Sequence, residues 1–584
     1  MTIDAFAELL EPADLHVAQR LSALGKEADD RVTLAVALAV RAVRGGSVCV
    51  DLRAIAEQVG MPELPWPEPR RWRDAVEASA LAGLQVLRLY SDTTTDLLYL
   101  DRYWREEQQV CDDVLALLAA PPRTAVPDLA RLFPAGWEEQ RAAADAALRQ
   151  PLTVLTGGPG TGKTTTVARL LAAIAEQADS AGAPPPRMAL AAPTGKAAAR
   201  LADAVAGEVG KLADVDQARL SGLRATTLHR LLGSRPDTSS RFRHHRGNRL
   251  PHDVIVVDET SMVSLTMMAR LLEAVRPDAR LLFVGDPDQL ASVDAGAVLA
   301  DLVEGLGGNR ASEATGKRPR ASEATGNRSR VSEATGNRSG VVELQTSHRF
   351  GEAIGALAQA IRAGDADATV DLLRGGGDAV AWLDTDDPSD ALREPLAERA
   401  AALREAALLG DAGSALAILD THRLLCAHRN GPYGVTQWNR RVERWLSDRT
   451  GQSMWSQWYP GRPLLVTAND YGLGVYNGDT GVVVAAPEGL RAHIGALQFA
   501  PGRLGEVDTM FAMTIHKSQG SQADEVTVLM PPADSRLLTR ELFYTAVTRA
   551  KKRVQVVGTE ASVRAAVGRR ATRASGLARR LASR

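Results

Sequence analysis

A glycine-rich run at residues 157–164 carries the clearest chemical signal in this sequence. It reads Gly157-Gly158-Pro159-Gly160-Thr161-Gly162-Lys163-Thr164, the G-x-x-x-x-G-K-[ST] spacing of a loop whose backbone N–H groups wrap phosphates. Glycine tolerates the backbone conformations that such a loop needs. We expect the Lys163 ammonium to reach the β- and γ-phosphates and the Thr164 hydroxyl to hold Mg²⁺. The run, extended to Thr165, therefore predicts a nucleotide site.

An acidic pair follows a second apolar stretch. Residues 254–257 read Val-Ile-Val-Val and are followed by Asp258 and Glu259. Open parallel sheets bind ligands at the carboxyl ends of their strands, so this pair is expected beside the phosphate loop. We expect Asp258 to hold Mg²⁺ and Glu259 to orient and deprotonate an attacking water.

Gln289 follows a third apolar stretch, in the run 285–289 that reads Gly-Asp-Pro-Asp-Gln. A neutral amide can hydrogen-bond both a γ-phosphate and a water without adding charge. We therefore expect Gln289 to report hydrolysis to the rest of the molecule. The alternative is a plain Asp-Pro turn, which the position after a parallel strand disfavours.

Two arginines far along the chain complete the candidate site. Arg349 lies in the run 346–350 and Arg549 in the run 543–550. If a second domain faces the first across the nucleotide, both can reach the γ-phosphate as arginine fingers from the same chain. Arginine suits that role because its fork donates two hydrogen bonds and stays charged. A surface salt bridge is the alternative for each.

The elements that must position these residues indicate an α/β protein with two parallel-sheet domains. Apolar strands at 152–155, 188–192, 254–257 and 281–285 alternate with helical segments, which predicts a parallel sheet. We place a helical N-terminal domain at 1–125, a first α/β domain at 126–345, a second at 346–570, and a basic tail at 571–584. A β-rich insertion, about 455–510, interrupts the second domain. The N-terminal domain shows no catalytic constellation, so we expect an interaction or scaffold role for it.

Bulk composition narrows the class of protein. The chain has 584 residues, 45% of them hydrophobic but only 4% aromatic, and a net charge of −2. Any nucleic-acid surface must therefore be local. Its three cysteines, Cys49, Cys111 and Cys426, form no C-x-x-C pair, so neither a disulfide framework nor a zinc site is indicated. Because we find no signal peptide and no 18-residue apolar span, we expect a soluble, cytoplasmic protein with no membrane association.

Three basic segments stand apart from this pattern. Residues 309–339 repeat a ten-residue unit, with seven Lys and Arg against three Glu. We interpret them as a disordered insert, the alternative being a DNA tether. Residues 234–248 form a basic excursion, read either as a small hairpin insert of about 234–250 or as a solvated loop. The last segment, 564–584, has seven Arg and no acid, which suggests contact with nucleic acid or a partner chain.

Taken in order, the motifs resemble those of superfamily 1 helicases. The series continues with Ala192-Pro193-Thr194-Gly195-Lys196, the run 226–232 (Thr-Thr-Leu-His-Arg-Leu-Leu), the run 477–481 (Asn-Gly-Asp-Thr-Gly), the run 514–520 (Thr-Ile-His-Lys-Ser-Gln-Gly), and Thr545-Ala546-Val547-Thr548-Arg549. Together they resemble the RecD family, the α subunits of RecBCD (exonuclease V) complexes. The resemblance covers roughly 135–555 apart from the repeat insert, and the first 125 residues match the family's partner-binding domain by position and length.

The resemblance implies an ATP-driven motor that moves 5′→3′ on single-stranded DNA, with two RecA-like domains closing on ATP and Mg²⁺. The β-rich insertion would be SH3-like. Gln140 would contact adenine. The positions that match groove motifs are Pro193, Thr194, Lys196, His229, Arg230, Thr514 and His516. The resemblance also implies RecB-like and RecC-like partner subunits, a role at duplex ends in recombinational repair, and a nuclease located on a partner chain.

Two other functions stay open at this stage. A free-standing RecD-like helicase would carry the same motor, but such relatives tend to have a helix-hairpin-helix region, and we find no clear repeat of that kind in 1–125. A nucleotide-regulated structural subunit would bind and turn over ATP without any response to DNA.

Overall fold

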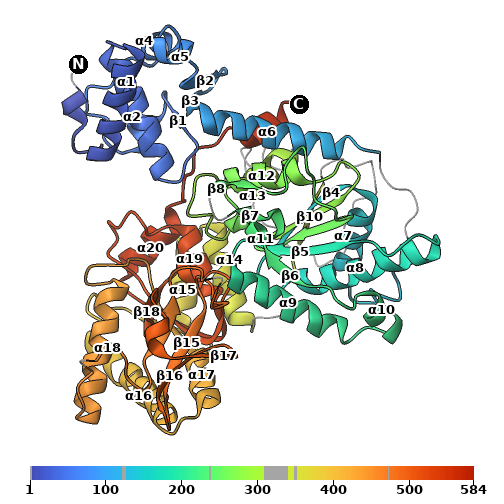
Figure 1. Ribbon diagram of the computed structural model, residues 1–584. Coiled ribbons are helices and arrows are strands. Elements are labelled where there is room, and N and C mark those ends of the chain that lie inside the picture. Colours follow the sequence, from blue (N-terminus) through green and yellow to red (C-terminus); the bar gives the residue numbers. More distant parts are fainter. Residues whose placement is uncertain are drawn as a thin grey trace, which may run out of the picture.

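The computed structural model describes residues 3–121, 127–235, 238–307, 340–346, 351–454, 456–470 and 472–584, and gives no side-chain description for 235–241. The predicted repeat insert at 309–339 and the predicted site residue Arg349 lie outside the described residues. Figure 1 shows three parts: a small N-terminal domain, a first domain around one parallel sheet, and a second domain below it. The predicted fold class, α/β with two parallel sheets, is confirmed.

The N-terminal part is mainly helical. Its helices are η1 (Ile3–Phe6), α1 (Pro12–Gly25), α2 (Asp30–Arg44), α3 (Ile55–Gln58), α4 (Pro69–Glu77) and α5 (Ala80–Gly83). The Asp29 carboxylate caps α2 by accepting the Arg31 N–H at 2.8 Å, as polar residues before helices do. The buried face of α2 packs in a core with Trp72 of α4 and Leu98.

A short antiparallel sheet also belongs to this part, which the prediction of a helical domain did not include. The order is β1 (Cys49–Asp51), β3 (Asp96–Leu100) and β2 (Leu87–Ser91). The strands have only three, five and five residues, too few for an alternating pattern to stand out. From β3 the chain enters α6 (Asp101–Leu118) directly, and that helix leaves this domain to pack on the first parallel sheet.

The first parallel sheet has the strand order β11-β4-β10-β9-β5-β6, with every pairing parallel. Its strands are β4 (Leu152–Gly157), β5 (Met188–Ala192), β6 (Ala225–Thr227), β9 (Val254–Val257), β10 (Arg280–Gly285) and β11 (Val341–Leu344). All four strands predicted from apolar runs are present. The central strands are buried along their whole length, as expected when helices cover both faces.

Two helical layers cover that sheet. One face packs α7 (Glu138–Arg149), α8 (Lys163–Ser180), α9 (Gly195–Val209) and α10 (Asp214–Arg219). The other face packs α6, α11 (Leu228–Leu232), α12 (Leu265–Ala274) and α13 (Val298–Leu306), with η2 (Thr260–Met262) between β9 and α12. A hairpin of β7 (Ser234–Arg235) and β8 (Thr238–Phe242) follows α11, within the basic excursion.

The second parallel sheet has the order β12-β21-β20-β13-β19. Its strands are β12 (Val380–Leu383), β13 (His422–Cys426), β19 (Ala512–Thr514), β20 (Ala523–Leu529) and β21 (Ala550–Val557). The helices of this domain are α14 (Glu352–Ala363), α15 (Ala366–Gly375), α16 (Ser389–Leu408), α17 (Ala412–Thr421), α18 (Val435–Thr450), η4 (His516–Ser518), α19 (Arg540–Val547) and α20 (Glu560–Gly568).

A five-stranded antiparallel sheet is inserted between α18 and β19. Its order is β17-β16-β15-β14-β18, formed by β14 (Pro463–Val466), β15 (Thr480–Ala486), β16 (Gly489–Ile494), β17 (Leu497–Phe499) and β18 (Val507–Thr509), with η3 (Pro501–Arg503) before β18. It has a small core of its own, around Leu464, Val483 and Ile494. The β-rich insertion in the predicted fold is therefore present.

The C-terminal segment is folded onto its own chain, which the expectation of a tail contacting nucleic acid or a partner did not foresee. Helix α21 (Leu577–Ala582) packs Leu577 and Leu581 into the core that α6 and α13 share. Arg580 is 7% exposed and pairs with the fully buried Glu107 of α6 at 2.7 Å. The acidic partner is far away in sequence, so the charge of the segment alone could not reveal the pairing.

Within the described part of the chain, no helix combines the length and apolar character needed to cross a bilayer.

Candidate active site between the two parallel sheets

The phosphate loop joins the carboxyl end of β4 to the first turn of α8. Gly157, Gly160 and Gly162 have φ angles of 153°, 85° and 87°, a region that residues with a Cβ rarely adopt. A Cβ on Gly157 would also lie 2.6 Å from the carbonyl oxygen of Leu344. Glycine is therefore required both by the backbone conformation and by the space available.

Lys163 is the first residue of α8 and folds back over the loop. Its ammonium donates to the carbonyl oxygen of Gly157 at 2.5 Å and to that of Gly158 at 2.8 Å. Thr164 and Thr165 follow in the same turn and are half-buried. A cation and two hydroxyls thus gather at a helix N-terminus, where free N–H groups and the helix dipole favour an anion.

Gln140 supports the outer side of the loop. It lies on α7, is 3% exposed, and its amide donates to the carbonyl oxygen of Thr161 at 3.3 Å. Thr161 in turn donates through its hydroxyl to the carbonyl oxygen of Gly158 at 3.0 Å. The structure therefore places Gln140 against the loop, at Thr161 and Gly162.

The acidic pair follows β9, which lies next to β10 and one strand further from β4. Burial, followed by the charge of Glu259, raises the pKa of Asp258 to about 6, against the opposing charge of Lys163. Glu259 has φ 50° and ψ 41°, a left-handed conformation that costs a residue with a side chain roughly 1 kcal/mol or more. Backbone strain of this kind concentrates where a side chain must be aimed.

Asp286 and Gln289, after β10, form the next part of the site. The Gln289 amide donates to Asp286 Oδ2 at 3.0 Å, and the Asp288 N–H donates to Asp286 Oδ1 at 3.1 Å. Asp286 and Gln289 are 3% and 7% exposed. This segment is a closed, buried turn rather than a solvated Asp-Pro turn.

Arg549 reaches this turn from the second domain. It lies between α19 and β21, is 3% exposed, and its guanidinium donates to Gln289 Oε1 at 3.0 Å. It also donates to the carbonyl oxygen of Thr545 at 3.1 Å. Burial lowers the pKa of Arg549, while the charge of Glu259 raises it. The surface salt bridge considered for this arginine is therefore wrong. Its partner Arg349 lies outside the described residues.

Three further hydrogen bonds and two ion pairs join the two domains here. The Leu290 N–H donates to the Thr545 hydroxyl at 2.9 Å, and the Gln519 amide donates to the Leu290 carbonyl oxygen at 2.8 Å. Tyr544 donates to Asp286 Oδ2 at 3.1 Å. Arg362 of α14 pairs with Asp288 at 2.5 Å and with Glu343 at 2.9 Å.

The residues predicted to contact DNA divide into two groups. The first group lies where the first domain faces the β-rich insertion and the 514–520 segment. The Thr194 hydroxyl caps α9 by accepting the Ala197 N–H at 3.2 Å, Gly195 packs directly under Tyr476, and Arg200 donates to the carbonyl oxygen of Gly520. Pro193, Lys196, Thr514 and His516 belong to the same junction and are half-buried.

Lys196 and His516 have shifted pKa values. Burial, followed by the charge of Arg423, lowers the pKa of Lys196 to about 8. Burial, followed by the charge of Arg573, lowers the pKa of His516. The second group, His229 and Arg230, lies on the exposed side of α11, where the His229 ring packs edge-on against Phe242 with the centroids 5.8 Å apart.

Sequence reasoning missed the residues that connect the two domains. Tyr544, Gln519 and Arg362 were not singled out, although the first two lie inside quoted motifs. Tyr476 was missed too, and no stacking aromatic was named, although it directly precedes the Asn477-Gly478-Asp479 turn. The only available signal for Tyr544 and Gln519 was their position within a motif, because their partners are more than 200 residues away in sequence.

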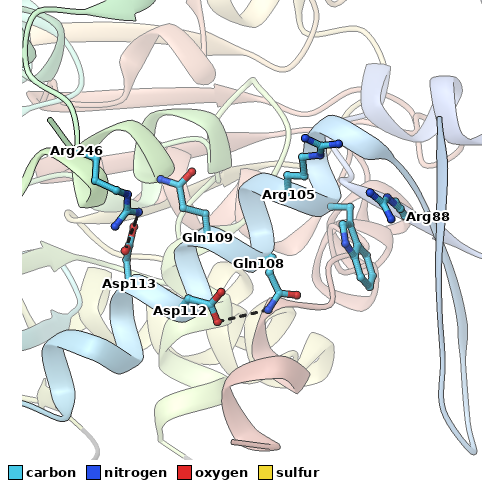
Figure 2. Close-up of a pocket in the computed structure, with 8 residues that line it drawn as sticks. Arg88, Arg105, Gln108, Gln109, Asp112, Asp113 and Arg246 are labelled. Carbon is cyan, nitrogen blue, oxygen red and sulfur yellow. Dashed lines mark hydrogen bonds and ion pairs between the residues drawn. The ribbon is translucent and has the colours of Figure 1, made fainter. Parts of the chain in front are cut away.

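A second recess lies away from this site, between α6 and the basic excursion. It has a volume of about 420 Å³ and is lined by Arg88, Trp104, Arg105, Gln108, Gln109, Asp112, Asp113 and Arg246. Figure 2 shows Arg246 pointing at Asp113, to which it is paired at 2.8 Å. The basic excursion is thus fixed to α6 through Arg246, and the recess contains balanced rather than free charge.

Two parallel sheets of this kind, with a phosphate loop on one and a buried arginine delivered by the other, define a two-domain nucleotide motor. Comparisons with known proteins agree. Residues 140–295 match the AAA domain family, 509–557 match the UvrD-like helicase C-terminal domain, and 7–95 match the N-terminal domain of RecBCD enzyme subunit RecD.

Whole-chain relatives identify the family. RecBCD enzyme subunit RecD of Mycolicibacterium smegmatis is 67% identical over 99% of both chains. ATP-dependent RecD2 DNA helicase of Deinococcus radiodurans is 31% identical over 81% of this chain but only 56% of its own length. Among solved structures, Pif1 helicase from Bacteroides is 16% identical over 73% of this chain and 93% of its own, with a TM-score of 0.37, a likeness too distant to bear on the site. The chain belongs to the RecD family.

Proposed function

We propose that the chain is an ATP-dependent 5′→3′ translocase and helicase on single-stranded DNA, the motor subunit of a RecBCD-type complex that processes double-strand ends for recombinational repair. Membership of the RecD family makes it an ATP-dependent DNA helicase subunit. The observation that carries the mechanism is the hydrogen bond from Arg549 to Gln289 across the domain junction. The groups needed for hydrolysis come together only where the two domains meet.

In this mechanism the phosphate loop holds the nucleotide. Backbone N–H groups of the loop, Pro159 excepted, and the Lys163 ammonium would bind the phosphates, and Gln140 would contact the adenine. Lys163 now bonds loop carbonyls that carry no charge, and phosphate oxygens would be stronger acceptors. We therefore expect the phosphates to replace the Gly157 and Gly158 carbonyl oxygens as hydrogen-bond acceptors of Lys163.

The donor set also fits Mg²⁺. A hydroxyl from Thr164 and a carboxylate from Asp258 are hard oxygen ligands, which Mg²⁺ prefers. The raised pKa of Asp258 comes from burial and from the neighbouring charge of Glu259, both of which a divalent cation offsets. When bound, Mg²⁺ neutralises phosphate charge during transfer.

Glu259, Gln289 and the arginines act on the reacting atoms. Glu259 accepts a proton from the attacking water, and its strained backbone aims the carboxylate. Gln289 contacts the γ-phosphate and the water, and Arg549 stabilises the charge that develops on the transferred phosphoryl group. We assign Arg349 a parallel role on the basis of the family motif.

Single-stranded DNA would lie along the junction that contains Pro193, Thr194, Lys196, Thr514 and His516, and would also contact His229 and Arg230 on α11. Hydroxyls, backbone amides and isolated cations suit contact with phosphates of any sequence. Tyr476, packed on Gly195, adds an aromatic ring to this junction.

We further propose RecB-like and RecC-like partner subunits, because RecBCD subunits are the relatives that match over their whole length. The RecD2 helicase of Deinococcus radiodurans matches over only 56% of its own length, so this part of the proposal rests on the RecBCD subunits. We assign nuclease activity to a partner chain, because the sequence shows no constellation of clustered acids. All three cysteines are buried and free, compatible with work in the cytoplasm.

Unwinding of tailed duplexes tests this function. The purified chain should separate a duplex with a 5′ single-stranded tail in the presence of ATP and Mg²⁺, and leave a duplex with a 3′ tail intact. The same chain without ATP is the control. Strand separation from the 3′ tail would contradict the assigned polarity, and equal action without ATP would contradict the motor itself.

A further inference from the structure

Three linked hydrogen bonds connect Tyr544, Asp286, Gln289 and Arg549, and two of them cross the junction between the domains. From the second domain, Tyr544 donates to Asp286 Oδ2 at 3.1 Å, and Arg549 donates to Gln289 Oε1 at 3.0 Å. Within the first domain, the Gln289 amide donates to the same Asp286 oxygen at 3.0 Å. Because Asp286 fixes the amide, Gln289 must turn its carbonyl oxygen toward Arg549.

Tyr544 also lies against the phosphate loop. A Cβ placed on Gly158 would lie 3.2 Å from the Tyr544 hydroxyl oxygen. Gly158 also supplies one of the carbonyl oxygens that accept hydrogen bonds from the Lys163 ammonium. One hydroxyl is thus next to the loop that binds phosphates and bonded to the carboxylate that orients Gln289.

The environment keeps this phenol a donor. Tyr544 is 4% exposed, and its ring packs in the core of the second domain. Burial, followed by the charges of Asp286 and Asp288, raises the pKa of Tyr544 well above its ordinary value. The hydroxyl therefore stays protonated across the range in which the protein works.

Helix α19, which carries Tyr544, contributes two neighbouring side chains to the contact with the first domain. Thr539 caps α19, and Tyr544 and Thr545 on this helix bond Asp286 and the Leu290 N–H. Arg549 follows directly after the helix. A movement of α19 relative to the first domain must therefore shift Tyr544 and Arg549 together.

We propose that Tyr544 is a positioning residue for hydrolysis: its hydroxyl holds Asp286 so that Gln289 and Arg549 are aligned when the second domain closes on the phosphate loop. This inference rests on the proposed function and adds the group that couples closure to alignment. Tyr544 itself neither accepts nor donates a proton during the reaction.

Replacing the hydroxyl tests the proposal. Tyr544→Phe keeps the ring in its core and removes only the donor. We expect kcat for ATP hydrolysis on single-stranded DNA to fall about tenfold, as for loss of a hydrogen bond to a charged group, while KM for ATP stays within about twofold because the phosphate loop is intact. A merely structural role would leave the ratio of DNA-stimulated to basal rate unchanged.

A matched control lies in the same domain. Tyr459 is also buried and donates to a carboxylate, Glu443, at 2.8 Å, away from the junction. Tyr459→Phe should leave the DNA-stimulated ratio at the wild-type value. The Asp286→Ala background supplies a second measurement, because adding Tyr544→Phe there should have no further effect.

Several results would overturn the inference. These are a Tyr544→Phe variant with wild-type kcat, equal loss in the Tyr459→Phe control, or a full additional loss in the Asp286→Ala background. Failure of the proposed function would look different, since the wild-type chain would then show no DNA stimulation at all.

Discussion

The two faces of the nucleotide junction are built in different ways. The first domain offers a contiguous loop, 157–164, whose contacts are made by backbone carbonyls, the Thr161 hydroxyl and a single lysine. The second domain offers separate side chains, Tyr544, Thr545 and Arg549, which bond the turn at 286–290 rather than the loop itself. The contacts of the phosphate loop form within one domain, whereas the contacts of Tyr544, Thr545 and Arg549 form only where the two domains meet.

We infer from this difference that nucleotide binding and ATP turnover depend on different faces of the junction. A loop built within one domain can bind a nucleotide in any relative position of the domains. Arg549 and its linked hydrogen bonds require one relative position, so hydrolysis can depend on whatever brings the domains together. Variants of the first face should therefore lose nucleotide binding, and variants of the second should lose turnover alone.

The largest effect is expected for the first face. Lys163→Gln removes the charge at the loop, and we expect ATP turnover to fall at least about a thousandfold together with weaker ATP binding. Thermal unfolding should be nearly unchanged, because the lysine is half-buried and donates to carbonyl oxygens of its own loop. Steady-state hydrolysis and nucleotide titration check both parts. A variant that still unwinds a 5′-tailed duplex would show that the site is assigned wrongly.

Arg549→Lys should come next and separate the two faces. Lysine keeps the charge but loses the fork, and we expect turnover to fall about a thousandfold with ATP affinity retained. Arg374→Lys is a suitable control, since that exposed arginine pairs with Glu560 on the surface of the same domain. If Arg549→Lys lost ATP binding as severely as Lys163→Gln, the division of labour between the faces would be wrong.

Glu259→Gln tests the chemistry within the first face. The amide preserves size but cannot accept the proton of water, so hydrolysis should fall about a hundredfold while ATP binding stays. Single-turnover hydrolysis and nucleotide binding, measured on the same preparation, distinguish the two. Unaltered hydrolysis would show that another residue acts as the general base.

The smallest effect concerns DNA. The pKa of Lys196 is lowered from 10.5 to about 8, so this lysine is charged at pH 7 and loses its charge as pH rises through 8. Affinity for single-stranded DNA should therefore fall a few-fold between about pH 7 and 9. Lys196→Arg should flatten that dependence, because arginine stays charged. As a control, Lys211→Gln changes an exposed lysine paired with Glu208 and should retain the wild-type dependence of DNA affinity on pH. If the groove assignment were wrong, Lys196→Arg would retain that dependence too.

The same contrast explains what the sequence could reveal. The strands β4, β9 and β10, the glycines and Asp258 were predictable because local spacing and apolar runs define them. Arg549 was singled out from the sequence as an arginine finger for the γ-phosphate, but its bond to Gln289 was not expected. Tyr544 was not, since it lies in the same motif but its role depends on Asp286, 258 residues earlier.

Contacts between distant segments account for the other differences. The seven arginines of 564–584 suggested an external partner, but Arg580 meets Glu107 and stacks on Trp104, with its guanidinium carbon 4.0 Å from the ring centroid. The residue types reveal the charge of such a segment. Only the folded structure shows the buried carboxylate with which that charge pairs.

The rate of ATP hydrolysis with and without single-stranded DNA, measured for the wild-type chain and for Arg549→Lys, tests most directly whether turnover depends on the meeting of the two faces. The wild-type rate should rise at least about tenfold on adding DNA, and Arg549→Lys should remain slow under both conditions. A wild-type rate indifferent to DNA would contradict the motor mechanism.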